Sequence, residues 1–214
     1  MNVPFVDLKI QYGSIKEEIL EAINRVFEDG VFVGGKYIQQ FEKDFAALHG
    51  VKHCIGVGNG TDAIFIILKI LGIGAGDEVI IPAHNWISAS EMLTLTGAQP
   101  VFIDSDPDTF TIDAAKIEAK ITKRTKAILP VHLYGQPSHL HELQSICRKF
   151  NLYLIEDCAQ SILAEENGRY VGTFGNASAF SFYPSKNLGA YGDGGAILTS
   201  DDDLEKKIRA YANH

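Results

Sequence analysis

The stretch HCIGVGNGTDAIFIILKIL, residues 53–71, decides the fold class of this sequence. An apolar run of strand length, Cys54 to Val57, leads through a glycine-rich turn into the segment from Thr61 to Leu71, which has the length of a helix. The same alternation returns several times downstream. It predicts a mostly parallel sheet with helices on both faces, and in such α/β folds ligands bind beyond the carboxyl ends of the strands.

Short apolar runs and helical periods place the remaining elements. We expect strands at 78–81, 101–103, 126–131, 153–155, 177–183 and 196–199, and helices at 87–96, 114–121, 140–150 and 201–212.

The first fifty residues have helical patterns only. Ser14 and Glu17 form a capping box ahead of a first helix that ends at Gly30, and a second amphipathic helix ends at Gly50. We therefore expect a helical arm over residues 1–50 and one α/β domain over residues 51–214, with no second domain.

Composition excludes several classes of function. The formal net charge is -8, and the nineteen basic residues are scattered along the chain, which argues against a nucleic-acid or membrane surface and favours small-molecule partners. No apolar run approaches the roughly 20 residues that span a bilayer, and the first residues do not form a secretion signal, so we expect a cytoplasmic protein. The three cysteines lack C-x-x-C spacing and are expected to be reduced, mostly buried thiols.

The turn from Gly58 to Ala63 brings glycines and free helix amides together, as a phosphate site requires. It also fits the loose fingerprint of a dinucleotide site, which would indicate a nicotinamide-dependent oxidoreductase. That fingerprint needs an acid at the end of the next strand, but this strand runs into Pro82 and Ala83. A plain turn without a ligand is the third interpretation.

Two side chains follow predicted strands at positions where a ligand would lie. Asp157 ends an apolar strand and would point into the ligand crevice, unless it is only a solvated acid at a strand end. Trp86, the only tryptophan, could lie on a planar heterocycle or pack in the core.

The segment from Ser178 to Gly195 places Lys186 between an aromatic strand and a glycine-rich loop. A lysine in a crevice would be partly desolvated, which lowers its pKa and favours the neutral amine that forms a Schiff base. Ser181, five residues earlier, could bind the phosphate of the same ligand.

These motifs together resemble the DegT/StrS type of sugar aminotransferases, which are fold-type I enzymes that depend on pyridoxal 5'-phosphate (PLP). The resemblance covers essentially the whole chain. It is carried by residues 41–46, 59–63, 125–128 with 131–136, 156–160 and 181–187. It implies an aspartate aminotransferase-like large domain, with the family's small C-terminal domain largely absent from this chain.

The resemblance also implies how the chain would hold the cofactor. Gly60, Thr61 and Ser181 would bind the phosphate, and Trp86 would stack on the pyridine ring.

Three further residues would act on the reactive part of the cofactor. Asp157 would pair with the ring nitrogen, keeping it protonated so that the ring becomes an electron sink, and Gln160 would contact the phenolic oxygen side. Lys186 would form the Schiff base and then move the proton as general base and acid. A histidine at this position marks dehydratase relatives, so Lys186 argues against that branch.

The activity implied by the resemblance is transfer of an amino group, by analogy from glutamate, to a nucleotide-linked keto-sugar in amino-sugar or polysaccharide biosynthesis. A homodimer is implied, in which the neighbouring subunit supplies part of the site. A truncated, inactive PLP-binding homologue is the alternative from a different class. The histidines His84, His132, His139 and His141 fall in different predicted loops and helices, so we expect structural or surface roles rather than a metal site.

Overall fold

The computed structural model describes residues 3–213. Met1, Asn2 and His214, at the ends of the expected arm and domain, lie outside the described residues. The elements in chain order are α1 (Leu8–Asp29), α2 (Gly35–His49), β1 (His53–Val57), α3 (Gly60–Ile70), β2 (Glu78–Pro82), α4 (Ser88–Thr96), β3 (Gln99–Ile103), η1 (Ala114–Lys116), η2 (Glu118–Lys120), β4 (Thr125–Ile128), η3 (Leu133–Gly135), α5 (Leu140–Phe150), β5 (Tyr153–Asp157), β6 (Glu165–Glu166), β7 (Arg169–Tyr170), β8 (Ala177–Ser181), β9 (Gly195–Thr199) and α6 (Asp202–Ala212).

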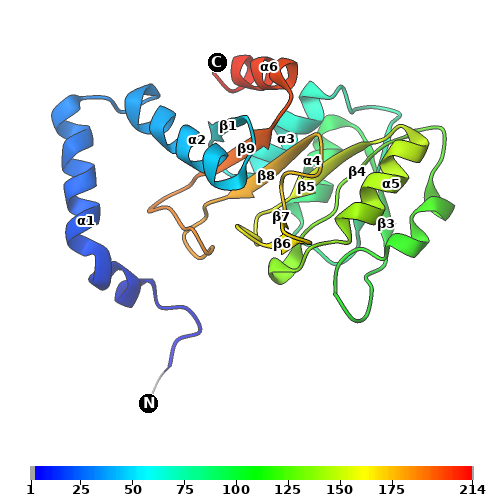
Figure 1. Ribbon diagram of the computed structural model, residues 1–214, viewed down its shortest axis with the longest axis horizontal. Coiled ribbons are helices and arrows are strands. Elements are labelled where there is room, and N and C mark those ends of the chain that lie inside the picture. The colour runs from blue at the N-terminus through cyan, green and yellow to red at the C-terminus, as the bar shows by residue number, and fades with distance from the viewer. Residues whose placement is uncertain (1–2, 214) are drawn as a thin grey trace.

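The centre of the molecule is a seven-stranded sheet in the order β1-β9-β8-β5-β4-β2-β3 (Figure 1). The pairs from β3 through β2, β4 and β5 to β8 are parallel, whereas β9 runs antiparallel to both β8 and β1. The predicted α/β class with a mostly parallel sheet is therefore confirmed.

Helices cover both faces of the sheet, and each face has its own apolar core. One core joins side chains of α3, α4 and α6 to the strands, and the other joins α2 and α5 to the strands. Both faces of the strands are thus buried, as the nearly continuous apolar runs predicted.

Helix α1 begins earlier than the predicted capping box. Asp7 caps it by accepting hydrogen bonds from the amides of Lys9 and Ile10, whereas Ser14 lies inside the helix and donates its hydroxyl to the Gln11 carbonyl. The predicted end is confirmed, since Gly30 closes the helix at φ 64°. No residue of α1 is buried, and the helix stands apart from the sheet (Figure 1).

The helix predicted at 114–121 is wrong, because the segment forms two 3₁₀ turns. Ala114 and Ile117 are buried, and their spacing of three residues fits a 3₁₀ turn as well as an α-helix. Two strands end earlier than predicted. The strand predicted at 126–131 ends at Ile128 (β4), and the strand predicted at 177–183 ends at Ser181 (β8). The small β6–β7 hairpin was not predicted.

The topology brings several loops to one edge of the sheet. At this edge lie the carboxyl ends of the parallel strands β1, β2, β4, β5 and β8. The antiparallel strand β9 begins there, because its first residue, Gly195, pairs with both Val57 and Ser181. Within residues 3–213, no helix is both long and apolar enough to cross a bilayer.

Candidate active site

The turn between β1 and α3 presents free backbone amides at the shared edge. Asn59 caps α3, its side-chain oxygen accepting the Asp62 amide at 2.8 Å, which satisfies one amide of the first turn of the helix. The exposed Asp62 carboxylate lies toward Gly58, where an added Cβ would meet its oxygen at 2.5 Å. The backbone amides at the start of α3, and not the Asp62 carboxylate, are groups that an anion could bind.

Two glycines let this turn approach the neighbouring strands. A Cβ on Gly60 would lie 2.7 Å from the Cβ of Ser181, and one on Gly195 would be pressed against the backbone of Asn59 and Gly60. Only glycine fits at either place without moving the backbone. Close packing thus holds the start of α3 beside Ser181.

Two hydroxyls flank this turn. Ser181 Oγ accepts the Tyr183 amide at 3.3 Å, which leaves its own hydrogen free to donate. Thr61 Oγ1 lies 2.9 Å from the hydroxyl of Ser88, the first residue of α4.

Asp157 is the last residue of β5 and is only 7% exposed. Within the described residues its side chain has one hydrogen bond, which Oδ1 accepts from the Ala159 amide at 3.0 Å, so Oδ2 remains available. Burial raises the pKa of the Asp157 carboxyl, and the Ala159 amide, His132 and Lys186 partly oppose that shift. A cation placed against Oδ2 would stabilise the charged form.

Lys186 lies in the loop between β8 and β9, and its side chain is partly buried. Its amide donates to the Tyr183 carbonyl at 2.8 Å, and the Ala190 amide closes the loop on the Phe182 carbonyl at 2.7 Å. The Lys186 charge is the smallest of the contributions that lower the pKa of the Asp157 carboxyl against the effect of burial.

Gln160 lies just beyond β5 with its amide oriented by the backbone. Its Oε1 accepts the Tyr134 amide at 2.8 Å, which leaves the side-chain N–H groups free to donate. Tyr134 has φ 58°, a left-handed conformation that a tyrosine rarely adopts, and its hydroxyl lies 3.2 Å from His84 Nε2. Strained residues of this kind concentrate at functional sites.

Trp86 is 74% exposed in the segment between β2 and α4. The core-packing interpretation of this residue is therefore wrong. An exposed indole on a connection that starts at the shared edge is available to stack on a ligand.

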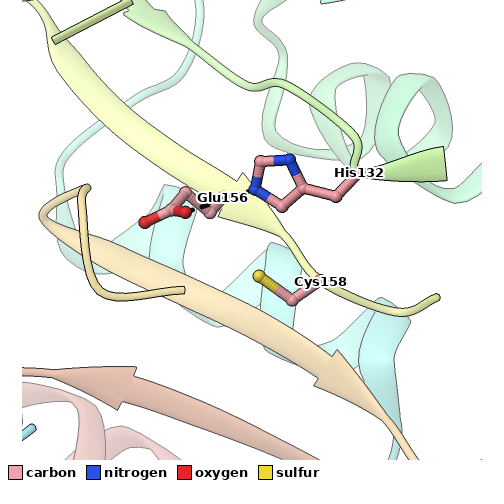
Figure 2. A group of neighbouring side chains, drawn as sticks. All are labelled: His132, Glu156 and Cys158. Atoms are coloured by element: carbon pink, nitrogen blue, oxygen red, sulfur yellow. Dashed lines mark hydrogen bonds and ion pairs between the residues drawn. The ribbon is translucent and has the colours of Figure 1, made fainter. Parts of the chain in front are cut away.

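Beneath the edge, His132, Glu156 and Cys158 form a buried group whose ligand atoms lie within 4.8 Å of one another. Figure 2 shows the His132 ring directed at the Glu156 carboxylate, and Nε2 and Oε2 are 3.2 Å apart. The Ser138 amide donates to His132 Nδ1, and because an N–H can only donate, Nδ1 carries no proton and the ring proton is on Nε2.

Hydrogen bonds already occupy this group, which argues against a metal site. Glu156 also accepts the backbone amides of Gly172, Phe174 and Gly175. Burial, with the charges of Glu156 and Asp157, raises the pKa of the Cys158 thiol well above its usual range. We interpret the group as a structural network.

The structure places all seven predicted site residues at or just beyond one edge of the sheet. They are Gly60, Thr61, Trp86, Asp157, Gln160, Ser181 and Lys186. Sequence analysis missed Ser88 and Tyr134. Tyr134 lies in the motif at 131–136, but the sequence did not indicate the contact of either residue, because their partners are 27 and 26 residues away.

Residues 13–214 match the family model of the DegT/DnrJ/EryC1/StrS aminotransferases. The chain belongs to this family. The sequence resemblance is thereby confirmed, and the nicotinamide alternative is abandoned.

Members of the aminotransferase family with known names are similar over the whole chain. The UDP-N-acetyl-3-dehydro-alpha-D-glucosamine 3-aminotransferase of Acidithiobacillus ferrooxidans is 46% identical over 99% of this chain and 58% of its own length. Among solved structures, S. venezuelae DesV in complex with a ketimine intermediate has a TM-score of 0.96 at 43% identity, over 99% of this chain and 57% of that one.

A third family member, NtdA from Bacillus subtilis, was solved with bound cofactor PMP. Its TM-score is 0.94 at 37% identity, over 100% of this chain and 48% of that one. The present chain thus spans about half to three fifths of the length of these relatives.

Proposed function

We propose that this chain binds pyridoxal 5'-phosphate at the shared edge and transfers amino groups to a nucleotide-linked keto-sugar. The observation that carries the proposal is the buried Asp157 carboxylate, which ends β5 and accepts only one hydrogen bond within residues 3–213. It lies at the edge of the sheet where ligands of this fold class bind, and Lys186 follows β8 at the same edge.

The free hydrogen-bonding groups of the site fit the cofactor. The Gly60 and Thr61 amides and the Ser181 hydroxyl can donate to a phosphate. Asp157 Oδ2 is available to a ring N–H, and the Gln160 amide can donate to a phenolic oxygen. Trp86 offers an exposed ring for stacking.

Each reactive side chain has a separate task in this proposal. Lys186 would hold the cofactor covalently through Nζ and, once the amino donor has displaced it, would carry the proton at the amino-bearing carbon. Asp157 would keep a proton on the ring nitrogen. When bound, the cofactor supplies an electron sink for the bond that breaks at this carbon.

The relatives support the class of substrate. Their names specify UDP- and dTDP-linked amino sugars. We infer the same class here, with glutamate as amino donor and amino-sugar or polysaccharide biosynthesis as the setting.

The experiment is a single-turnover reaction of the PLP-loaded protein with L-glutamate. Its rate is measured from the change in the visible absorption band of the cofactor and from the amount of 2-oxoglutarate formed. Asp157→Asn should slow this reaction about 100-fold or more, because the amide cannot balance a positive charge on the ring nitrogen. Asp104→Asn, which alters an exposed acid directly after β3, is the matched control and should react at the wild-type rate.

Two outcomes would count against the proposal. A wild-type protein that binds the cofactor but leaves glutamate unchanged contradicts the assignment as an aminotransferase. An Asp157→Asn protein as fast as wild type contradicts the role of Asp157.

We propose further that residues 1–50 form an arm and residues 51–214 the cofactor domain of a homodimer. The exposed apolar side chains of α1 and the turn after it, among them Ile10, Phe27, Phe32 and Val33, support a protein contact there. Sedimentation should give about twice the chain mass of 23.4 kDa, and a single-chain mass would contradict the dimer.

The cytoplasmic location stays a prediction.

A further inference from the structure

Ser88 makes a contact unlike those of the other hydroxyl residues of α4. Ser90, Thr94 and Thr96 donate to carbonyls of their own helix or its first turn, at 2.8–2.9 Å. The Ser88 hydroxyl instead lies 2.9 Å from Thr61 Oγ1 at the start of α3.

This contact lies in a closely packed place. Ser88 is only 9% exposed, and α3 and α4 pack together along the same apolar core. The start of α3 is itself fixed against Ser181 and Gly195, whose neighbourhood leaves no room for an added Cβ on Gly60. The Thr61 hydroxyl is therefore held in place from the side of α4.

The direction of the hydrogen bond determines what Thr61 can do. A threonine hydroxyl has one hydrogen, and within the described residues Ser88 is its only partner. If Ser88 donates to Thr61 Oγ1, the Thr61 hydrogen is free to point at an anion at the start of α3. Hydrogen bonds in such a chain polarise one another and strengthen the outer donor.

We infer that Ser88 is a positioning residue for the phosphate of the cofactor, acting through the hydroxyl of Thr61. The inference rests on the proposed function, because the phosphate it concerns belongs to the proposed ligand. Its ligand class is a phosphate monoester dianion, which accepts hydrogen bonds and donates none at neutral pH.

The test compares the affinities of two ligands that differ only in the phosphate, PLP and pyridoxal. Ser88→Ala should weaken PLP binding about 5- to 10-fold, the effect of one hydrogen bond, while pyridoxal affinity changes less than about twofold. Spectroscopic titration gives both dissociation constants without relying on turnover. Ser90→Ala, a change to another α4 hydroxyl that bonds only its own turn, should alter neither affinity.

A double-mutant cycle separates action through Thr61 from a general effect on packing. In a Thr61→Val background, Ser88→Ala should cause no further loss of PLP affinity, because the donor that Ser88 orients is already gone. Equal losses for PLP and pyridoxal, an unchanged PLP affinity, or additive losses in the double mutant would each overturn the inference. These outcomes presuppose PLP binding by the wild-type protein. Absence of that binding would instead contradict the proposed function, and the inference with it.

Discussion

Lys186→Ala is expected to lower the rate of amino transfer about 100- to 10,000-fold, the range that removal of a general acid and base produces. The alanine can neither hold the cofactor nor carry the proton at the amino-bearing carbon. The rate of 2-oxoglutarate formation from glutamate, with PLP in excess, measures the effect.

The control for this change is another lysine with no part in the site. Lys69→Ala removes an exposed lysine in the last turn of α3, and the variant should match the wild-type rate. A Lys186→Ala protein that retains wild-type turnover would be incompatible with the proposed chemistry.

Glu156→Ala is expected to lower the free energy of unfolding by about 3–5 kcal/mol, because each buried donor left without its acceptor costs about 1–3 kcal/mol. Glu156 is fully buried, and its loss leaves three backbone amides and the His132 ring without their acceptor. Because domains are stable by only about 5–15 kcal/mol, this variant should be close to unfolding at room temperature. Urea denaturation measures the change.

Glu165→Ala provides the comparison, because Glu165 is an exposed acid in the nearby β6–β7 hairpin. Its free energy of unfolding should stay within about 0.5 kcal/mol of wild type. A loss below about 1 kcal/mol for Glu156→Ala would mean that the buried network does not hold β5 and the segment before β8 together.

Much of the fold could be predicted because the spacing of apolar residues indicates the type and the length of each strand and helix. Helix α5 was predicted at its observed bounds, and both arm helices end at the predicted glycines. The start of α1 was missed because two capping signals compete, and Asp7, which satisfies two amides, lies earlier in the chain. The antiparallel direction of β9 was not predicted, although β8 and β9 follow one another without a helix between them. Its pairing with β1 joins strands that are distant in sequence.

In the candidate site, too, some residues could be predicted from the sequence and others could not. Asp157 and Lys186 could be predicted because each lies at or after the end of an apolar strand, and such positions meet at one edge of a parallel sheet. The contacts that orient the site residues could not be predicted. Ser88 reaches Thr61, and Tyr134 reaches Gln160, only because α3 lies beside α4 and the segment after β4 lies beside the end of β5.

The most direct test of the central claim is to incubate the purified protein with PLP, record its visible spectrum, reduce it with borohydride and map the modified peptide. We predict an absorption band that borohydride removes, with the cofactor mass fixed on Lys186. A folded protein without the band, or with the mass on another lysine, would contradict the assignment of Lys186 and the function built on it.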